Sequence, residues 1–166
     1  MNHQPDANDS FYLFDSVAHC LEHTLRVIAK ARRKLYIISH QLDPLIYDRD
    51  DTALALSQFA RRARNCELHI LVRDTADMLE RGHRIARLHQ RLPSKVQLRK
   101  LVIEPNNPQM GFICADRDFL LYKNDDTQPT GFANYQAAQE VKNLADEHQR
   151  IWQHALAEPG LRPLHL

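Results

Sequence analysis

The chain has 166 residues, of which 43% are hydrophobic and 26% are charged, a composition typical of one globular domain with its own core. Its formal net charge of +1 excludes the overall basicity of a general nucleic-acid-binding protein. No apolar run reaches the ~18 residues of a membrane span, and the polar stretch 1–10 has no signal-peptide core. We therefore expect a cytoplasmic protein that contacts no membrane.

The first two thirds of the chain alternate between predicted helices and strands. Residues 11–33 predict a helix that Asp15 or Ser16 caps, and residues 35–38 form an apolar run typical of a buried strand. A second helix is predicted from residue 51 or 52 to 64, a strand at 68–72, a third helix from 75 until before Pro93, and a strand at 96–103. This alternation is the signature of an α/β domain.

The last third begins with a loop at 104–109, which contains two prolines and two asparagines. Two short strands, 110–115 and 119–122, are predicted around a turn at Asp116-Arg117-Asp118, followed by a polar loop at 123–130 and a helix at 134–156. The full order predicts a mostly parallel central sheet with helices on both faces. One domain at 11–158 is expected between a disordered lead, 1–10, and a tail, 159–166.

Metal and disulfide chemistry find little support in the sequence. The three cysteines Cys20, Cys66 and Cys114 are odd in number and far apart, so we interpret them as buried thiols of the core. His19 and His23 stand one helical turn apart but lack a third ligand at a suitable spacing. The chain also has no glycine-rich phosphate loop, and we expect neither a metal site nor a cofactor.

The element order, the strand that leads into Asp116 and the late tryptophan Trp152 of the last helix resemble one repeat of the phospholipase D superfamily. The family's motif is His-x-Lys, four further residues and Asp, on a strand. The resemblance implies a histidine nucleophile, a second histidine as acid and lysines that hold the phosphate charge. Because family members join two such repeats, it also implies a possible homodimer of this chain, with a shared groove.

The motif is degenerate in this chain. Aligning its aspartate with Asp116 places Gln109 at the histidine position and Gly111 at the lysine position. Glutamine forms no stable phospho-enzyme bond, and glycine carries no charge. We therefore expect no catalytic residue and no enzyme activity, and we interpret the chain as a non-catalytic binding or regulatory module that takes an anionic ligand.

The chain also resembles an uncharacterised bacterial family that occurs alone or fused behind acetyltransferase domains. The resemblance lies in three segments, at 82–94, 97–100 and 115–117. It implies an acetyltransferase or another protein as a candidate partner, and it supplies no mechanism.

Candidate ligand-binding residues fall into two groups. Ligands of α/β sheets bind beyond the carboxyl ends of the strands, which points to His40, Arg73, Asp74, Asp116 and Arg117. Residues 61–100 hold 11 Lys/Arg against 4 Asp/Glu. The second group of candidates lies in this basic segment and consists of His83, Arg84, Arg87, Arg91, Ser94 and Arg99. Arg84, Arg87 and Arg91 share one helix face, which can bind an anion or be a solvated surface that pairs with Asp74, Asp77 and Glu80.

Two alternative functions remain open on the sequence. A diverged phosphodiesterase or nuclease would use another histidine, such as His40 or His83. A nucleic-acid-binding protein would use the basic segment 81–100, although that segment has few aromatic side chains for stacking on bases.

Overall fold

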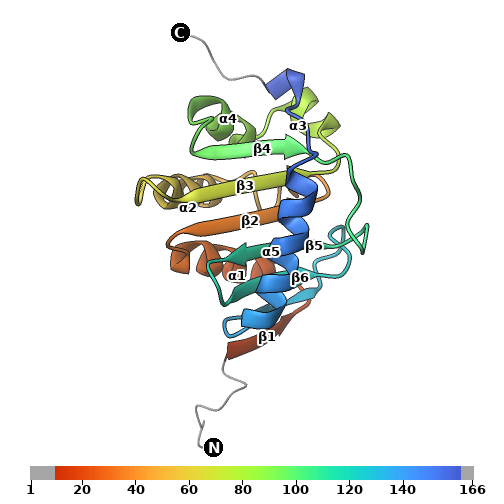
Figure 1. Cartoon of the computed structure of the whole chain (residues 1–166). Helices are drawn as coiled ribbons and strands as arrows, with labels where there is room; N and C mark the ends of the chain where they lie inside the picture. The colour runs from red at the N-terminus through yellow and green to blue at the C-terminus, as the bar shows by residue number, and fades with distance from the viewer. Residues whose placement is uncertain (1–9, 162–166) are drawn as a thin grey trace, which may run out of the picture.

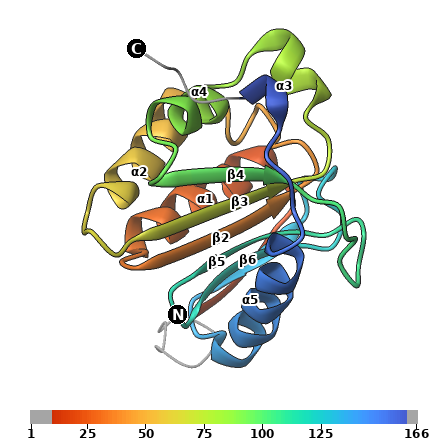
Figure 2. The same ribbon diagram turned by 45° about the horizontal axis from the view of Figure 1, so that its top comes forward.

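A seven-stranded sheet divides the molecule into two layers of helices (Figures 1 and 2). The computed structural model describes residues 10–161. The strands lie in the order β1-β7-β6-β5-β2-β3-β4 across the sheet. Their bounds are β1 Phe11–Phe14, β2 Lys34–Ser39, β3 Glu67–Val72, β4 Val96–Lys100, β5 Gly111–Ala115, β6 Phe119–Lys123 and β7 Gly131–Asn134.

Helices cover both faces of this sheet, as the sequence predicts. The helices α1, α2 and α4 lie on one face and α5 lies alone on the other (Figure 2). The helix bounds are α1 Val17–Lys30, α2 Asp50–Ala60, α3 Ala76–Arg81, α4 Arg84–Arg91 and α5 Ala138–Trp152, with a short 3-10 helix η2 at Pro159–Leu161. Each face therefore has its own apolar core, one beneath α1, α2 and α4 and one beneath α5.

The prediction of a mostly parallel sheet is wrong. Only β2, β3 and β4 are parallel neighbours, whereas β2–β5, β5–β6, β6–β7 and β7–β1 are antiparallel pairs. The reversal occurs after β4, where the loop at 101–110 leads into β5 from the carboxyl end of the parallel strands. A hairpin then returns the chain through β6, because a short turn joins only antiparallel strands. The second half of the chain thus extends an α/β sheet with a meander.

Three predicted elements differ in detail. Residues 11–14 form β1 rather than a helix, and α1 begins after Ser16, whose side chain accepts a hydrogen bond from the His19 amide at 3.2 Å. The predicted third helix is two short helices, because Gly82 between them has a φ of 79° that ordinary helix excludes. The predicted loop at 123–130 leads into a further strand, β7, and α5 begins only at Ala138.

The expectation that the three cysteines are buried thiols of the core is confirmed. The three cysteines are buried and free, and His148 and Trp152 are buried on α5. Residues 1–9 of the predicted lead and 162–166 of the predicted tail lie outside the described residues. Within residues 10–161, no helix has the length and apolar character needed to cross a membrane.

Candidate functional site

The carboxyl end of β2 is where the start of the segment 109–116 meets the rest of the sheet. Ile38 of β2 pairs with Phe112 of β5, and Gly111 pairs with Lys123 at the end of β6. The loop that follows β6 then returns over this edge, and its Asp126 amide donates a hydrogen bond to the Gln109 carbonyl at 2.8 Å. Three antiparallel strands and one loop therefore bring together Ser39, Gly111, Lys123 and Asp126.

Both carboxylate oxygens of Asp126 have partners within the protein. Its Oδ2 accepts hydrogen bonds from Ser39 Oγ at 2.8 Å and from the His40 amide at 2.7 Å. Its Oδ1 lies 3.8 Å from Lys123 Nζ, which also donates to the Asp126 carbonyl at 2.8 Å. Both side chains are buried, at 6% and 11% exposure. The ammonium and the carboxylate thus neutralise each other inside the protein.

Gly111 has room for no side chain. A Cβ built at this position would lie 2.0 Å from Asp126 Oδ1 and 2.5 Å from Asp126 Cγ. The space that the motif's lysine would need is therefore occupied by Asp126. The structure instead carries a lysine on the neighbouring strand, because Lys123 stands directly beside Gly111 in the β5–β6 register.

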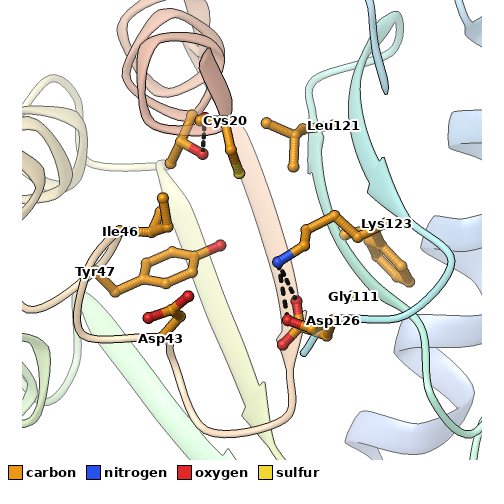
Figure 3. A pocket seen from close by; sticks show the side chains of 10 residues that line it. Cys20, Asp43, Ile46, Tyr47, Gly111, Leu121, Lys123 and Asp126 are labelled. Atoms are coloured by element: carbon orange, nitrogen blue, oxygen red, sulfur yellow. Dashed lines mark hydrogen bonds and ion pairs between the residues drawn. The ribbon is translucent and has the colours of Figure 1, made fainter. Parts of the chain in front are cut away.

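The space left around this pair holds about one water molecule. The cavity measures about 10 Å³ and is lined by residues that include Cys20, Tyr47, Lys123 and Asp126 (Figure 3). Burial raises the pKa of the Cys20 thiol and raises that of the Tyr47 phenol well above its ordinary value. Both groups therefore stay protonated near neutral pH, and neither supplies an ionised nucleophile.

The two remaining motif positions lie apart. Gln109 is exposed, in the loop before β5. Asp116 lies at the opposite end of β5, where its carboxylate accepts hydrogen bonds from the backbone amides of Arg32, Arg33 and Lys34 at 2.8–3.2 Å. Asp116 therefore ties the β5–β6 turn to the start of β2. Because β5 runs antiparallel to β2, this turn and Arg117 lie roughly 17 Å from the carboxyl edge.

His40, Arg73 and Asp74 do meet at the carboxyl edge. The Arg73 amide donates to the Ser39 carbonyl and the Asp74 amide to the His40 carbonyl, so the parallel pairing continues one residue past the strands. The Asp74 side chain caps α3 through the Ala76 amide. The Arg73 side chain is only 9% exposed, and its nearest acidic atom, Glu104 Oε2, lies 3.8 Å from Nε. Burial lowers the pKa of Arg73.

The basic segment is partly compensated by acids that the sequence analysis did not pair with it. Arg84 binds Asp50 at 2.7 Å and Asp48 at 3.2 Å, not Asp74, Asp77 or Glu80. Arg84, Arg87 and Arg91 line an open groove of about 450 Å³ beside α2. Ser94 is exposed at the end of this segment.

His83 and Arg99 have structural contacts. His83 Nδ1 accepts from the Ile85 amide at the start of α4, and Nε2 donates to the Leu42 carbonyl at 2.9 Å. Both ring nitrogens are thus used, and burial lowers the pKa of this histidine. Arg99 stacks over Trp152 with its guanidinium carbon 4.3 Å from the ring centre and donates to the Trp152 carbonyl.

Sequence reasoning pointed to the end of the strand at Ser39 and missed Lys123 and Asp126. The available signal is a lysine that ends an apolar strand, 119–122, followed by two acids in a polar loop. It becomes meaningful only once the antiparallel register places Lys123 beside Gly111. Within residues 10–161, no group of three or more His, Cys, Asp and Glu side chains is arranged to hold a metal ion.

Solved structures with the same fold cover most of this chain. NucT from Helicobacter pylori superposes with a TM-score of 0.64 at 10% identity, over 89% of this chain and 98% of that one. Nuc from Salmonella typhimurium, a phospholipase D family member, superposes with a TM-score of 0.60 at 16% identity, over 88% and 95% of the two chains. At these identities the likeness establishes a phospholipase D-like fold and nothing finer.

A third structure is TrmBL2, an archaeal chromatin protein described with a novel mode of DNA binding. Its TM-score is 0.61 at 12% identity; the match covers 89% of this chain and spans about half of TrmBL2, 54% of its length. No curated protein matches the sequence. A family model does match, over residues 16–164. The chain therefore belongs to the family described as "Domain of unknown function (DUF7931)".

Proposed function

We propose that this chain is a non-catalytic module that binds an anionic ligand on a phospholipase D-like fold. The observation that carries the proposal is that the motif pocket, which is the space beside Gly111 where the family motif has its lysine, is filled. Asp126 occupies the space beside Gly111 and neutralises Lys123, so a substrate phosphate finds neither a cation nor room at that point. Gln109 offers an amide where the family chemistry needs a nucleophile.

The anionic ligand is the second half of the proposal. The carboxyl edge holds two buried cations, Lys123 and Arg73. Lys123 is neutralised by Asp126, whereas Arg73 has no hydrogen-bond partner among the described residues. Its acidic neighbour is the exposed Glu104, at 3.8 Å from Nε, so its hydrogen-bond donors are available at the edge where ligands of such sheets bind.

The diverged phosphodiesterase of the sequence analysis is the runner-up, and it now depends on His40. Both ring nitrogens of His83 are already hydrogen-bonded within the protein, which leaves no nitrogen to attack phosphorus. His40 is partly exposed at the carboxyl edge, within the region that a phosphodiester would have to approach.

Hydrolysis of bis(p-nitrophenyl) phosphate separates the two functions. We expect the wild-type chain to release p-nitrophenol at the rate of buffer alone between pH 5 and 8. The His40→Ala variant is the matched control, since its side chain fills no part of the motif pocket. Turnover above buffer that disappears in His40→Ala would overturn the non-catalytic proposal and establish the phosphodiesterase.

A further inference from the structure

We infer that Arg73 is the charged centre of a binding site for the phosphoryl group of a small phosphorylated molecule, beneath the loop at 101–110. This inference rests on the proposed function and names its ligand class. Arg73 follows β3 at the carboxyl edge of the three parallel strands. The loop joins β4 to β5 and supplies Glu104, the acid that lies within 4 Å of the guanidinium.

The guanidinium of Arg73 is buried without hydrogen bonds. Its Nε, Nη1 and Nη2 atoms are all covered, and none has a hydrogen-bond partner among the described residues. Glu104 Oε2, at 3.8 Å from Nε, is beyond hydrogen-bond distance. A buried charge with five unused N–H donors is strongly unfavourable unless an anion satisfies them. The side chain is therefore built for a partner that the chain itself does not supply.

The other buried cation at this edge of the sheet, Lys123, has its partners within the chain. Lys123 has a carbonyl at 2.8 Å and a carboxylate at 3.8 Å, both from Asp126. Asp126 is held in turn by Ser39 and the His40 amide, so its carboxylate is not free to move toward Arg73. Of these two cations, only Arg73 is left to hold a ligand.

Access to Arg73 lies through the first half of the loop. The amides of Val102, Ile103 and Glu104 make no backbone hydrogen bond to another described residue, and the Glu104 side chain is 59% exposed. The second half is anchored, since the Asn106 amide donates to Glu147 of α5 and the Asn107 side chain to Asn124. Residues 102–104, which include the acid beside Arg73, are therefore the part of the loop that can move aside for a ligand while the rest stays in place.

The covered position of Arg73 selects a small terminal phosphoryl group. A carboxylate already stands beside Arg73 in Glu104 and makes no hydrogen bond, whereas a phosphoryl dianion brings three oxygens and twice the charge to the same fork of donors. The phosphates of duplex DNA lie along a wide cylinder, which cannot pass under a loop to reach a buried guanidinium. The ligand is thus a phosphorylated small molecule rather than a nucleic acid.

Calorimetric titration of the full chain with inorganic phosphate tests the inference. We expect one phosphate per chain, a loss of affinity of at least tenfold in Arg73→Met, and a gain of several-fold in Glu104→Gln, because the competing carboxylate is gone. Arg87→Met is the matched control, since it removes an arginine from the open groove beside α2, and it should leave the affinity unchanged. Thermal midpoints measured with and without phosphate should shift in the wild type and not in Arg73→Met.

Four results would overturn the inference, and the first three come from the phosphate titrations and their acetate control. They are no phosphate binding by either the wild type or Glu104→Gln, equal binding by Arg73→Met, and acetate binding as tight as phosphate, which would indicate a carboxylate site. A duplex oligonucleotide that competes with phosphate would also contradict it. These binding results do not measure phosphodiester hydrolysis. The phosphate site can therefore fail while the proposal of a non-catalytic module stands.

Discussion

Asp116 keeps its place in the motif as a structural residue. Its carboxylate accepts four hydrogen bonds from three consecutive backbone amides, those of residues 32–34, before β2 begins. It also adopts a φ of 53°, in the left-handed region that Asp and Asn tolerate better than most residues. The fold itself therefore needs an aspartate at this position, because the turn depends on its carboxylate.

Replacing Asp116 should cost stability without touching any ligand. Asp116→Ala leaves three amide groups without their acceptor, and we expect the free energy of unfolding to fall by about 2 kcal/mol. Asp116→Asn keeps an acceptor oxygen and the tolerance for this φ, so it should lose clearly less. Urea unfolding at pH 7 measures both. Equal stability of the alanine variant and the wild type would contradict this role.

His148 makes stability depend on pH. Its ring stacks on Tyr36, its Nε2 donates to the Ile37 carbonyl, and its buried Nδ1 has no hydrogen-bond partner among the described residues. Burial lowers its pKa from 6.5 to about 3. Below pH 6.5 the unfolded chain takes up a proton that the folded chain refuses, so stability falls as the pH drops from about 6.5 toward 3.

The His148→Gln variant should be less sensitive to acid than the wild type. Glutamine keeps an N–H donor near the Ile37 carbonyl and does not titrate. Between pH 7 and pH 5, we expect the wild type to lose about 2 kcal/mol more stability than the variant. Urea midpoints at the two pH values give the comparison, and parallel losses in both proteins would exclude His148 as the cause.

At the scale of elements, the strand β5 and the loop after β6 are fitted to each other. The loop can fill the motif pocket only because Gly111 has no side chain. The β5–β6 hairpin sets this fit, since its register places Lys123 beside Gly111 and starts the loop next to it. The pocket is thus closed by direct packing of the Asp126 side chain against Gly111. A larger residue at position 111 should therefore be tolerated better when residue 126 is smaller.

A double-mutant cycle tests this fit. Gly111→Ala should destabilise the chain by more than about 2 kcal/mol, because its Cβ would overlap the Asp126 carboxylate. In an Asp126→Gly background the same change should cost at least about 1 kcal/mol less. Additive losses in the two backgrounds would show that residue 111 and Asp126 do not compete for the same space.

The elements also show how far the sequence leads. Periodicity located α1, α2, α5 and the parallel strands, because those patterns are local. Strand direction is not local, since nothing in the apolar run 111–115 says which neighbour it joins, and the alternation of elements favoured a parallel sheet. That one error in strand direction grouped the candidate residues wrongly. It placed Asp116 and Arg117 with Arg73, and it hid Lys123 and Asp126, which only the antiparallel register brings to the edge.

At the scale of the whole molecule, the uneven charge along the chain is partly balanced by contacts between distant segments. The lysines and arginines at 61–100 are spread over the loop between α2 and β3, the residue after β3, α3, α4, the loop before β4, and β4 itself. Arg84, its most central member, is bound to Asp48 and Asp50 from the acidic first third. One charge of the basic segment is thus balanced by acids from a distant part of the chain once it is folded.

We therefore expect no shift of a 30-base-pair DNA duplex in a gel at ~50 mM salt with micromolar protein, where non-specific binding is strongest. The Arg87→Ala/Arg91→Ala double variant is the control. A shift in the wild type that this variant abolishes would revive the nucleic-acid function that the sequence left open, on the groove beside α2.

The position of β1 in the sheet has a consequence for the order in which the molecule is completed. The ribosome makes residues 11–14 before the other strands of the sheet, but their partner in the sheet is β7, at 131–134. The second face is covered by α5, which follows at 138–152. A nascent chain with β2, β3 and β4 can already pack against α1 and α2, while one whole face of its sheet stays bare. Protection of that face from aggregation thus depends on α5, which is synthesised after every strand of the sheet.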